Sequence, residues 1–183
     1  MICRFIDTHC HFDFPPFSGD EEASLQRAAQ AGVGKIIVPA TEAENFARVQ
    51  ALAEKYQPLY AALGLHPGML EKHSDVSLDQ LQQALERRPA KVVAVGEIGL
   101  DYHYDTHPRE YQRFWFIQQL RLAEETGLPV VIHSREASQD TFDIIERSKV
   151  RRGSIHCYSG SAEMAKDYVK MGFHIGVGGV VTF

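Results

Sequence analysis

Val92-Val93-Ala94-Val95-Gly96-Glu97 is a continuous apolar run that ends in a glycine and a carboxylate. Pro129-Val130-Val131-Ile132-His133 repeats this pattern, with an imidazole at its end. A half-buried strand alternates apolar and polar residues, whereas a strand buried on both faces is apolar throughout. Strands of the second kind occur in parallel sheets whose faces are both covered by helices. The two runs therefore predict inner strands of a parallel sheet.

Shorter β-rich runs precede and follow these two. The expected strands are Cys3–Asp7, Lys35–Val38, Leu59–Leu63, Lys91–Gly96, Pro129–His133, Ser154–Tyr158 and Phe173–Val177. Amphipathic helical stretches separate them; for example, Leu78, Leu81 and Leu85 repeat at helical spacing. We expect Ser77 to cap that helix at its N-terminus and Gly127 to end a later helix. The alternation of strands and helices is typical of an α/β fold with a mainly parallel sheet.

Such a sheet can be an open doubly wound sheet or a TIM-type (β/α)8 barrel. A dinucleotide-binding fingerprint would favour the open sheet, but Gly176-Val177-Gly178-Gly179 lacks the spacing of the third glycine. The sequence contains no phosphate-binding Walker loop either. The reactive residues favour the barrel, because metal-binding groups follow several strands and a barrel gathers the ends of its strands at one mouth.

The composition is that of an ordinary folded protein. The chain has 183 residues, of which 44% are hydrophobic and 23% charged, and this excludes an intrinsically disordered or low-complexity protein. A net charge of −5 predicts no global attraction to nucleic acid or to an anionic membrane. No apolar run reaches the roughly 20 residues that span a bilayer, and we expect no secretory signal. Cys3, Cys10 and Cys157 lack metal-site spacing, so we expect reduced thiols and a cytoplasmic protein.

Side chains that can bind a metal stand at the ends of several expected strands. His9 and His11 follow the first strand, and residues i and i+2 of an extended chain point to the same side, so both imidazoles can reach one cation. The others are His66 after the third strand, Glu97 after the fourth, His133 at the end of the fifth and His156 within the sixth. Active sites of parallel barrels lie at the carboxyl ends of the strands. These residues therefore predict a metal site at the mouth of a barrel.

The same segments resemble the TatD-type deoxyribonucleases, a family of metal-dependent barrels in the amidohydrolase superfamily. Ile6-Asp7-Thr8-His9-Cys10-His11 resembles the first-strand signature of this family, and Val95-Gly96-Glu97-Ile98-Gly99-Leu100-Asp101 is similar to its fourth-strand motif. The other matches, in chain order, are Gly64-Leu65-His66-Pro67, Val131-Ile132-His133-Ser134-Arg135, Ile155-His156-Cys157-Tyr158-Ser159-Gly160 and Ile175-Gly176-Val177-Gly178-Gly179. The resemblance covers the whole chain. It implies a TIM-type barrel that hydrolyses phosphodiester bonds of DNA from the 3′ end.

The resemblance also implies a role for each metal-type residue. His9 and His11 would bind a first metal, His133 and His156 would bind a second, and Glu97 would bridge the two and take part in catalysis. A carboxylate has two oxygens and can span two cations, which an imidazole cannot. Two divalent ions together can activate a water and clamp a phosphodiester.

The expected cofactors are two divalent metal ions, Mg, Mn or Zn. Imidazoles with one carboxylate suit zinc, manganese or nickel, whereas pure oxygen sites favour magnesium, the metal with which the family is usually described as working. His66 and Arg135 are candidates for contacting a phosphate of the expected substrate, DNA in single strands or at 3′ ends. A supporting contact to a metal ligand, or a salt bridge, suits these two residues nearly as well.

The family places a further aspartate, the expected general base, in a Thr-Asp motif at the end of an eighth strand, and this sequence has no such pair. Typical barrels have about 250 residues. We therefore expect a single domain, residues 1–183, that lacks the eighth β/α unit and leaves the first and seventh strands as open sheet edges.

Two alternatives to an active nuclease stay open. One is a catalytically impaired metal-binding fragment or interaction module. The other is an amidase or lactonase of the same superfamily, although Glu97 stands where many such enzymes use a lysine that becomes carboxylated.

A basic cluster precedes the expected sixth strand and consists of Arg147, Lys149, Arg151 and Arg152. A connection from a helix to a strand lies on the face of a barrel opposite the active site. We therefore expect a solvated loop here and not a DNA-binding surface.

Overall fold

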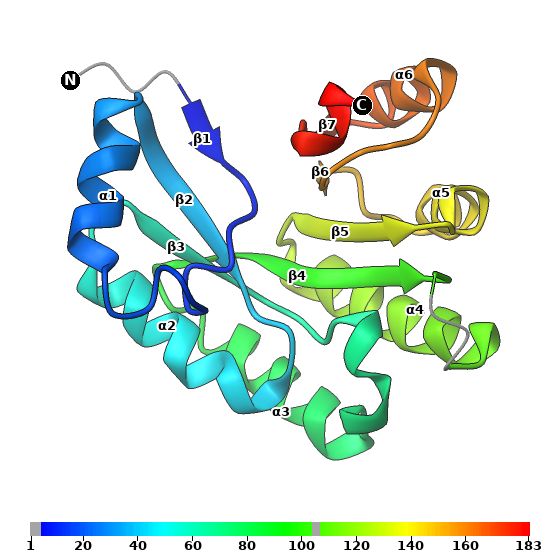
Figure 1. Cartoon of the computed structure of the whole chain (residues 1–183). Coiled ribbons are helices and arrows are strands. Elements are labelled where there is room, and N and C mark those ends of the chain that lie inside the picture. The colour runs from blue at the N-terminus through cyan, green and yellow to red at the C-terminus, as the bar shows by residue number, and fades with distance from the viewer. Residues whose placement is uncertain (1–4, 104–106) are drawn as a thin grey trace.

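The computed structural model describes residues 5–103 and 107–183. Seven strands of these residues form one sheet, in which strands that follow one another in sequence pair in parallel. The sheet curls, with β1 and β7 on either side of its open part (Figure 1). The strands are β1 (Phe5–Asp7), β2 (Val33–Pro39), β3 (Leu59–Leu63), β4 (Val92–Asp101), β5 (Val130–Arg135), β6 (Gly153–Ile155) and β7 (Phe173–Ile175). This TIM-like α/β architecture confirms the predicted fold class.

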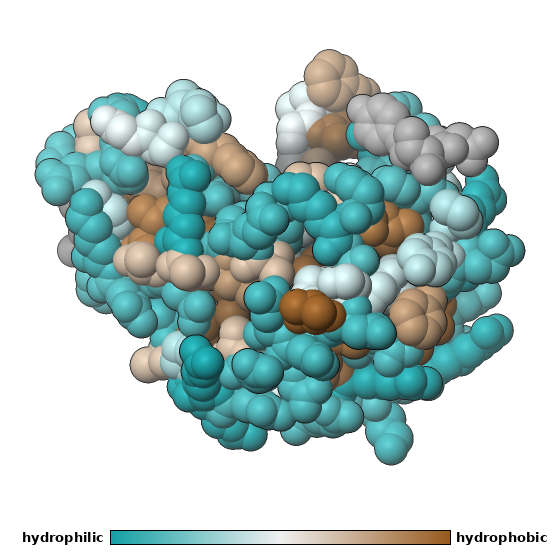
Figure 2. Space-filling view, turned by 90° about the horizontal axis from the view of Figure 1, so that it is seen from below, coloured by the Kyte–Doolittle hydropathy of each residue, from teal (hydrophilic) through white to brown (hydrophobic). Residues whose placement is uncertain are grey.

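Helices connect the strands and pack on the outside of the curled sheet (Figure 1). The α-helices are α1 (Glu21–Gln30), α2 (Phe46–Lys55), α3 (Asp75–Glu86), α4 (Arg109–Thr126), α5 (Ser138–Arg147) and α6 (Ala162–Lys170). Short 3-10 helices are η1 (Ala43–Asn45), η2 (Pro67–Lys72) and η3 (Gly179–Thr182). Seen from below, the surface is mostly hydrophilic with scattered apolar residues (Figure 2), as expected where amphipathic helices face solvent.

Among the residues described, none of the helices combines the length and the hydropathy that crossing a membrane requires.

A large apolar core lies between the helices and the sheet and inside the curl. Helix α2 buries Phe46, Val49 and Ala53 in this core, and α4 buries Phe116 and Leu120. Complete burial of one large apolar side chain stabilises a fold by about 1.5–3 kcal/mol. The packing of these helices against the sheet holds the backbone of the inner strands, and those strands carry the predicted site residues.

The first turn of α3 differs from the prediction. Ser74, and not Ser77, is the N-cap residue, since its hydroxyl accepts a hydrogen bond from the backbone N–H of Ser77 at 3.2 Å. The backbone N–H of Ser74 in turn donates to the hydroxyl of Ser77 at 2.8 Å, which completes a capping box. The prediction of Ser77 was wrong because both serines carry a capping hydroxyl. The prediction for Gly127 is confirmed, since it ends α4 with a φ of 69°.

The strands that carry the site have different ends from those predicted. β4 extends to Asp101 and β5 extends to Arg135, because the two strands stay paired as far as these residues. Glu97 therefore lies inside β4 and not after it. β6 ends at Ile155, so His156 follows this strand instead of lying within it. The ends of these strands are set by pairing between distant segments, and this pairing cannot be predicted from local residue preferences.

β1 and β7 are the edge strands of the described sheet, because β1 pairs with β2 alone and β7 with β6 alone. The predicted first strand begins at Cys3, which lies outside the described residues. Phe5 and Ile6 of β1 are 59% and 55% exposed, as expected of an edge whose outer side is uncovered. The predicted pair of open edges is confirmed for the residues described here, whereas the single-domain boundaries stay a prediction.

Candidate metal centre

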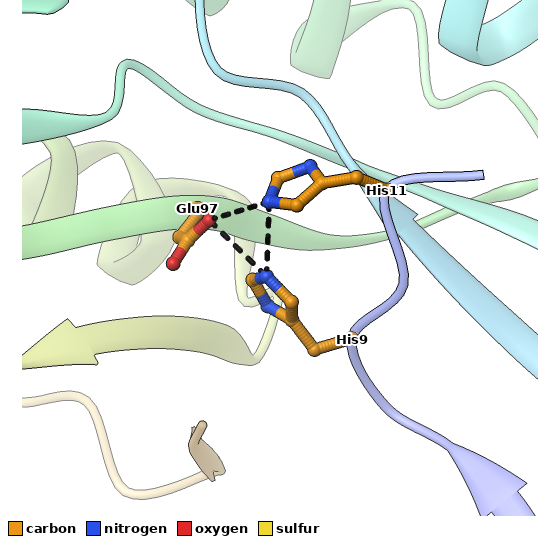
Figure 3. Close-up of side chains that lie close together, drawn as sticks. All are labelled: His9, His11 and Glu97. Atoms are coloured by element: carbon orange, nitrogen blue, oxygen red, sulfur yellow. Dashed lines mark hydrogen bonds and ion pairs between the residues drawn. The ribbon is translucent and has the colours of Figure 1, made fainter. Parts of the chain in front are cut away.

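His9 and His11 lie in the loop that follows β1. The carboxylate of Asp7 accepts a hydrogen bond from the backbone N–H of His9 at 3.1 Å. The backbone N–H of Cys10 donates to the carbonyl of Ile37 in β2 at 3.0 Å, which holds the loop against the sheet. The Nε2 atoms of His9 and His11 are 3.3 Å apart, and their rings are nearly perpendicular. Both imidazoles point toward the carboxylate of Glu97 (Figure 3).

Glu97 stands at the centre of the site and is only 1% exposed. The pairing of β4 with β5 shifts register between Val95 and Ile98, and such an irregularity changes the direction of a side chain. Gly96 allows the two strands to approach closely, because a Cβ at this position would lie 2.7 Å from the Cβ of Val131. The local path of β4 thus turns the carboxylate of Glu97 toward the carboxyl ends of the strands.

Each oxygen of Glu97 faces its own group of imidazoles. Oε2 lies 3.3 Å from Nε2 of His9 and 3.5 Å from Nε2 of His11. Oε1 lies 2.9 Å from Nδ1 of His133 and 3.1 Å from Nε2 of His156. His9, His11 and Glu97 are close enough together to hold one ion. The structure therefore brings all five predicted ligands together, in two pairs on the two sides of one carboxylate.

His66 joins the group around Oε1. Its Nδ1 accepts a hydrogen bond from the backbone N–H of Gly68 at 2.9 Å, and its Nε2 lies 3.6 Å from Oε1 of Glu97. The ring centroids of His66 and His133 are 4.5 Å apart. His66, Glu97 and His133 can also hold one ion between them. His66, predicted as a phosphate contact, is thus placed directly beside the predicted ligands.

Burial and mutual contacts set the protonation of the site. Burial disfavours the charged form of Glu97, but its close contacts with His11 and the other imidazoles outweigh the effect of burial and hold the pKa of this carboxyl well below its usual range. Burial also opposes the charge of His133, yet its bonds to Asp101 and Glu97 raise its pKa to about 9. For His9 burial dominates and lowers the pKa to about 3. An ionised carboxylate is therefore surrounded by imidazoles that differ strongly in their affinity for a proton.

The donor set fits divalent ions. Among the described residues, Oε2 of Glu97 accepts no hydrogen bond although it is buried and two imidazole nitrogens lie 3.3 and 3.5 Å away. A buried polar atom without a partner is costly, and a cation shared with the two imidazoles would satisfy this oxygen. Imidazole and carboxylate together suit ions such as zinc and manganese.

Asp101 is the residue of this site that sequence reasoning missed. Its Oδ2 lies 3.0 Å from Nε2 of His133. Burial raises the pKa of Asp101, but the bond to His133 and further contacts lower the net value. The sequence contains one indication of this contact. Asp101 follows Glu97 at an even spacing, and an even spacing puts two residues on the same face of a strand. That indication applies only if β4 extends to Asp101, and the predicted strand ended at Gly96.

Arg135 ends β5, and its side chain is exposed at the same end of the strand that carries His133. Its charge contributes to the lowered pKa of Asp101, so the guanidinium acts on the site electrostatically. Arg135 thus lies at the rim of the site and outside the group of imidazoles around Glu97.

Phe14 forms another part of the rim, to which the sequence assigned no role. It is 40% exposed, and its ring centroid lies 5.6 Å from that of His11. Its backbone N–H donates to the carbonyl of His11 at 3.1 Å, and its own carbonyl accepts hydrogen bonds from the N–H groups of Phe17 and Ser18. These bonds fix the turn that presents the ring of Phe14 beside a predicted metal ligand.

The basic cluster lies at the other end of the strands. Arg151 and Arg152 precede β6, whereas His156 follows it. The guanidinium of Arg151 donates to the carbonyl of Ser148, and that of Arg152 donates to the carbonyl of Gly127 at the end of α4, each at 2.7 Å. All four side chains of the cluster are exposed, as predicted for a solvated loop, and Arg151 and Arg152 also tie loops together away from the site.

Comparison with known proteins identifies the family. A family model described as TatD related DNase matches residues 6–183. YjjV, a metal-dependent hydrolase of Escherichia coli, is 69% identical over 184 residues, which cover 100% of this chain and 71% of YjjV. YabD, a metal-dependent hydrolase of Bacillus subtilis, is 36% identical over 97% of this chain and 70% of YabD.

Solved structures agree with the sequence relatives. The crystal structure of YjjV, a TatD homologue, matches with a TM-score of 0.96 over 100% of this chain and 71% of that chain, at 69% identity. A TatD family hydrolase from Entamoeba histolytica matches with a TM-score of 0.85 at 27% identity, over 97% of this chain and 65% of that chain. The chain therefore belongs to the TatD family of metal-dependent hydrolases.

Proposed function

We propose that this protein is a metal-dependent phosphodiesterase that hydrolyses DNA in single strands or at 3′ ends. The proposal depends above all on the two oxygens of Glu97, each of which faces its own group of imidazoles. A site for two ions suits displacement at a phosphodiester, which has an attacking and a leaving oxygen to stabilise. The description of the matching family model, TatD related DNase, supports the same substrate.

In this proposal His9, His11 and Glu97 would hold one divalent ion, and His133, His156 and Glu97 would hold the other. When bound, the two ions supply Lewis acidity, which lowers the pKa of a water and offsets charge on the phosphate oxygens. Glu97 stays ionised at neutral pH because its pKa lies well below the usual range. Because Glu97 is buried, water screens its charge very little.

Arg135 and His66 would bind the phosphate. The planar guanidinium of Arg135 can donate to two phosphate oxygens at once, and it is exposed at the carboxyl end of β5. Nε2 of His66 faces the space beside Oε1 of Glu97 and would donate to a further phosphate oxygen. Together they would orient the ester bond over the carboxylate.

Phe14 would favour a nucleic acid over a simple phosphodiester. A base that stacks on an aromatic side chain contributes about 1–3 kcal/mol to binding. The ring of Phe14 is partly exposed and lies 5.6 Å from that of His11, so a base could stack on it while its phosphate lies over the site. Phe14 would then bind the base of a nucleotide, and Arg135 and His66 would bind its phosphate.

The test is the cleavage of a single-stranded oligonucleotide labelled at its 5′ end, in the presence of added Mg, Mn or Zn. We expect a ladder that shortens from the 3′ end, and no ladder from an oligonucleotide that carries an inverted 3′ nucleotide. Glu97→Gln and His133→Ala should abolish cleavage. His174→Asn, at an exposed histidine of β7, should leave it unchanged. Full activity of Glu97→Gln would contradict the assignment of Glu97.

The same preparation is assayed with a p-nitrophenyl phosphodiester and with a panel of lactones and amides. Hydrolysis of lactones or amides without cleavage of phosphodiesters would replace the nuclease by an amidase or lactonase. Metal binding without any hydrolysis would identify a catalytically impaired metal-binding module.

A further inference from the structure

Both ring nitrogens of His133 contact carboxylates. Nδ1 lies 2.9 Å from Oε1 of Glu97, and Nε2 lies 3.0 Å from Oδ2 of Asp101. A neutral imidazole has one N–H group and one lone pair, so only one of its nitrogens can bind a cation. Whether His133 can serve as a ligand on the Glu97 side therefore depends on which nitrogen keeps the hydrogen.

The carboxylate of Asp101 is held firmly in place. Asp101 is 8% exposed, and its Oδ1 accepts a hydrogen bond from the backbone N–H of His103 at 3.0 Å. Its backbone is bound on both sides by the buried side chain of Gln112: the N–H of Asp101 donates to Oε1 at 2.8 Å, and its carbonyl accepts from Nε2 at 2.7 Å. Oδ2 is thus directed at His133 by contacts that do not involve His133.

The register of the two strands explains how the ring of His133 reaches this carboxylate. His133 pairs with Gly99, and Asp101 lies two residues farther along β4. Gly99 has a φ of 145°, and a Cβ there would lie 2.0 Å from the backbone oxygen of His133. With no side chain at Gly99, β4 and β5 approach closely, and the imidazole meets Asp101 at one nitrogen and Glu97 at the other.

We infer that Asp101 is a positioning residue that keeps the hydrogen of neutral His133 on Nε2, so that the lone pair of Nδ1 is directed to the ion on the Oε1 side of Glu97. The inference depends on the metal-binding role proposed for His133. An ionised carboxylate accepts hydrogen bonds and cannot donate one. Asp101 therefore stabilises the tautomer with a hydrogen on Nε2, orients the ring and strengthens Nδ1 as a ligand.

Asp101 would act on one of the two ions only. Its carboxylate contacts His133, whereas His9 and His11, on the Oε2 side, approach Glu97 through Nε2. Loss of a supporting carboxylate typically weakens metal binding by about 10–100-fold. The ion on the Oε1 side should be weakened by such a factor, and the other ion should be affected much less.

Asp101→Asn is the informative variant because it keeps the size of the side chain. An asparagine has one oxygen, and both the N–H of His103 and that of His133 require an acceptor. If the asparagine oxygen accepts the hydrogen bond from the N–H of His103, the amide NH2 faces Nε2 of His133. This arrangement favours the tautomer of His133 with a hydrogen on Nδ1. Asp140→Asn is the control, since Asp140 accepts hydrogen bonds from Tyr102 and Arg113 and contacts no metal-type histidine among the described residues.

The experiment is calorimetric titration of the metal-free variants with Zn²⁺ and with Mn²⁺. We expect Asp101→Asn to lose about 10–100-fold in affinity for one of two equivalents, and we expect Asp140→Asn to bind both like the wild type. The loss of the negative charge weakens Nδ1 as a ligand whichever way the amide is oriented, so wild-type affinity of Asp101→Asn for both equivalents would overturn the inference.

A second measurement uses the wild-type protein, so it does not depend on the folding of a variant. Nitrogen-15 NMR of the Zn²⁺-loaded protein distinguishes the two tautomers of His133, and a hydrogen on Nδ1 would also overturn the inference. Neither measurement involves DNA. A protein that binds both ions in the expected way but cleaves no DNA would therefore disprove the proposed nuclease function and leave the role of Asp101 intact.

Discussion

The imidazole rings of His9 and His156 stack with their centroids 3.7 Å apart and an angle of 13° between their planes. His9 follows β1 and His156 follows β6. In a flat sheet, strands five positions apart would be separated by about 24 Å, since neighbouring strands lie 4.7–4.9 Å apart. The contact therefore exists because the sheet curls, and the same curvature places both imidazoles against one carboxylate, that of Glu97.

Glu97→Gln should weaken the binding of both proposed ions. Glutamine keeps the size of the side chain but replaces one carboxylate oxygen by an NH2 group, which cannot bind a cation. Replacement of supporting residues around a metal already costs about 10–100-fold in affinity, so the equivalent that loses its oxygen ligand should lose more than this, and the other should be weakened by the loss of the negative charge. Metal analysis of the protein after dialysis against dilute Mn²⁺ measures the effect. Two retained equivalents would show that Glu97 does not bridge the ions.

The metal-free protein should become less stable as pH rises through the range in which His133 titrates. The contacts of His133 raise its pKa from 6.5 to about 9, so the folded state binds this proton more tightly than the unfolded state. The stabilisation is fully present below pH 6.5 and is lost as pH rises to about 9. For this largely buried group the loss is on the order of 3 kcal/mol.

Urea unfolding in the presence of a chelator, at several pH values from 6 to 9.5, measures this loss. His133→Asn should flatten the decline, because asparagine does not titrate in this range. The exposed His174 provides the matched control, and His174→Asn should show the wild-type decline. An equal pH dependence in wild type and His133→Asn would show that another group is responsible.

The predicted ligands could be identified from sequence because each follows or ends a short apolar run. His9 and His11 needed only the alternation of an extended chain, and Glu97 and His133 ended the two most apolar runs. The role of Asp101 could not be recognised in this way. It depends on how far β4 stays paired with β5 and on the direction of one imidazole ring, and contacts between distant residues determine both.

The direction of the Glu97 side chain could not be predicted from local sequence patterns either. A motif shows that a carboxylate follows Val95 and Gly96, but the shift of register that turns it arises from the fit of β4 against β5. The division of the imidazoles between its two oxygens also depends on the curvature of the whole sheet. Residue types at strand ends therefore predicted which residues meet, and tertiary packing determined the geometry in which they meet.

Gly96→Ala should destabilise the fold and disturb the site together. The added Cβ would lie 2.7 Å from the Cβ of Val131 and 3.0 Å from its backbone oxygen. Overpacking of this kind typically costs about 1–3 kcal/mol. Because the clash involves the backbone of β5, β4 would have to move, and the carboxylate of Glu97 would move with it. We expect a lower urea midpoint and weaker binding of Mn²⁺.

Gly179→Ala is the control for this substitution, since a Cβ at Gly179 in η3 meets no atom within 4 Å. It should change neither the midpoint nor the affinity for Mn²⁺. If Gly96→Ala matched this control in both measurements, the close approach of β4 and β5 at Gly96 would not be needed to place Glu97.

Phe14→Ala should separate the recognition of a base from the hydrolysis of the ester. If a base stacks on Phe14, the variant loses about 1–3 kcal/mol of binding energy, which corresponds to a KM for a short oligonucleotide raised by roughly 5- to 150-fold. The value of kcat should change little, because the ring offers no group that binds a metal or transfers a proton. Steady-state kinetics with a single-stranded trinucleotide measures both constants.

Methyl p-nitrophenyl phosphate distinguishes a stacking role from a structural one, because it offers a phosphodiester without a base. The ring of Phe14 lies 5.6 Å from that of His11, so its removal could also loosen a predicted ligand. A loosened ligand would slow hydrolysis of both substrates to the same extent, whereas lost stacking affects the trinucleotide far more. Tyr111→Ala, at an aromatic residue of α4 that is 56% exposed, should affect neither substrate. Equal losses for the two substrates in Phe14→Ala would therefore exclude base stacking and assign Phe14 to the support of His11.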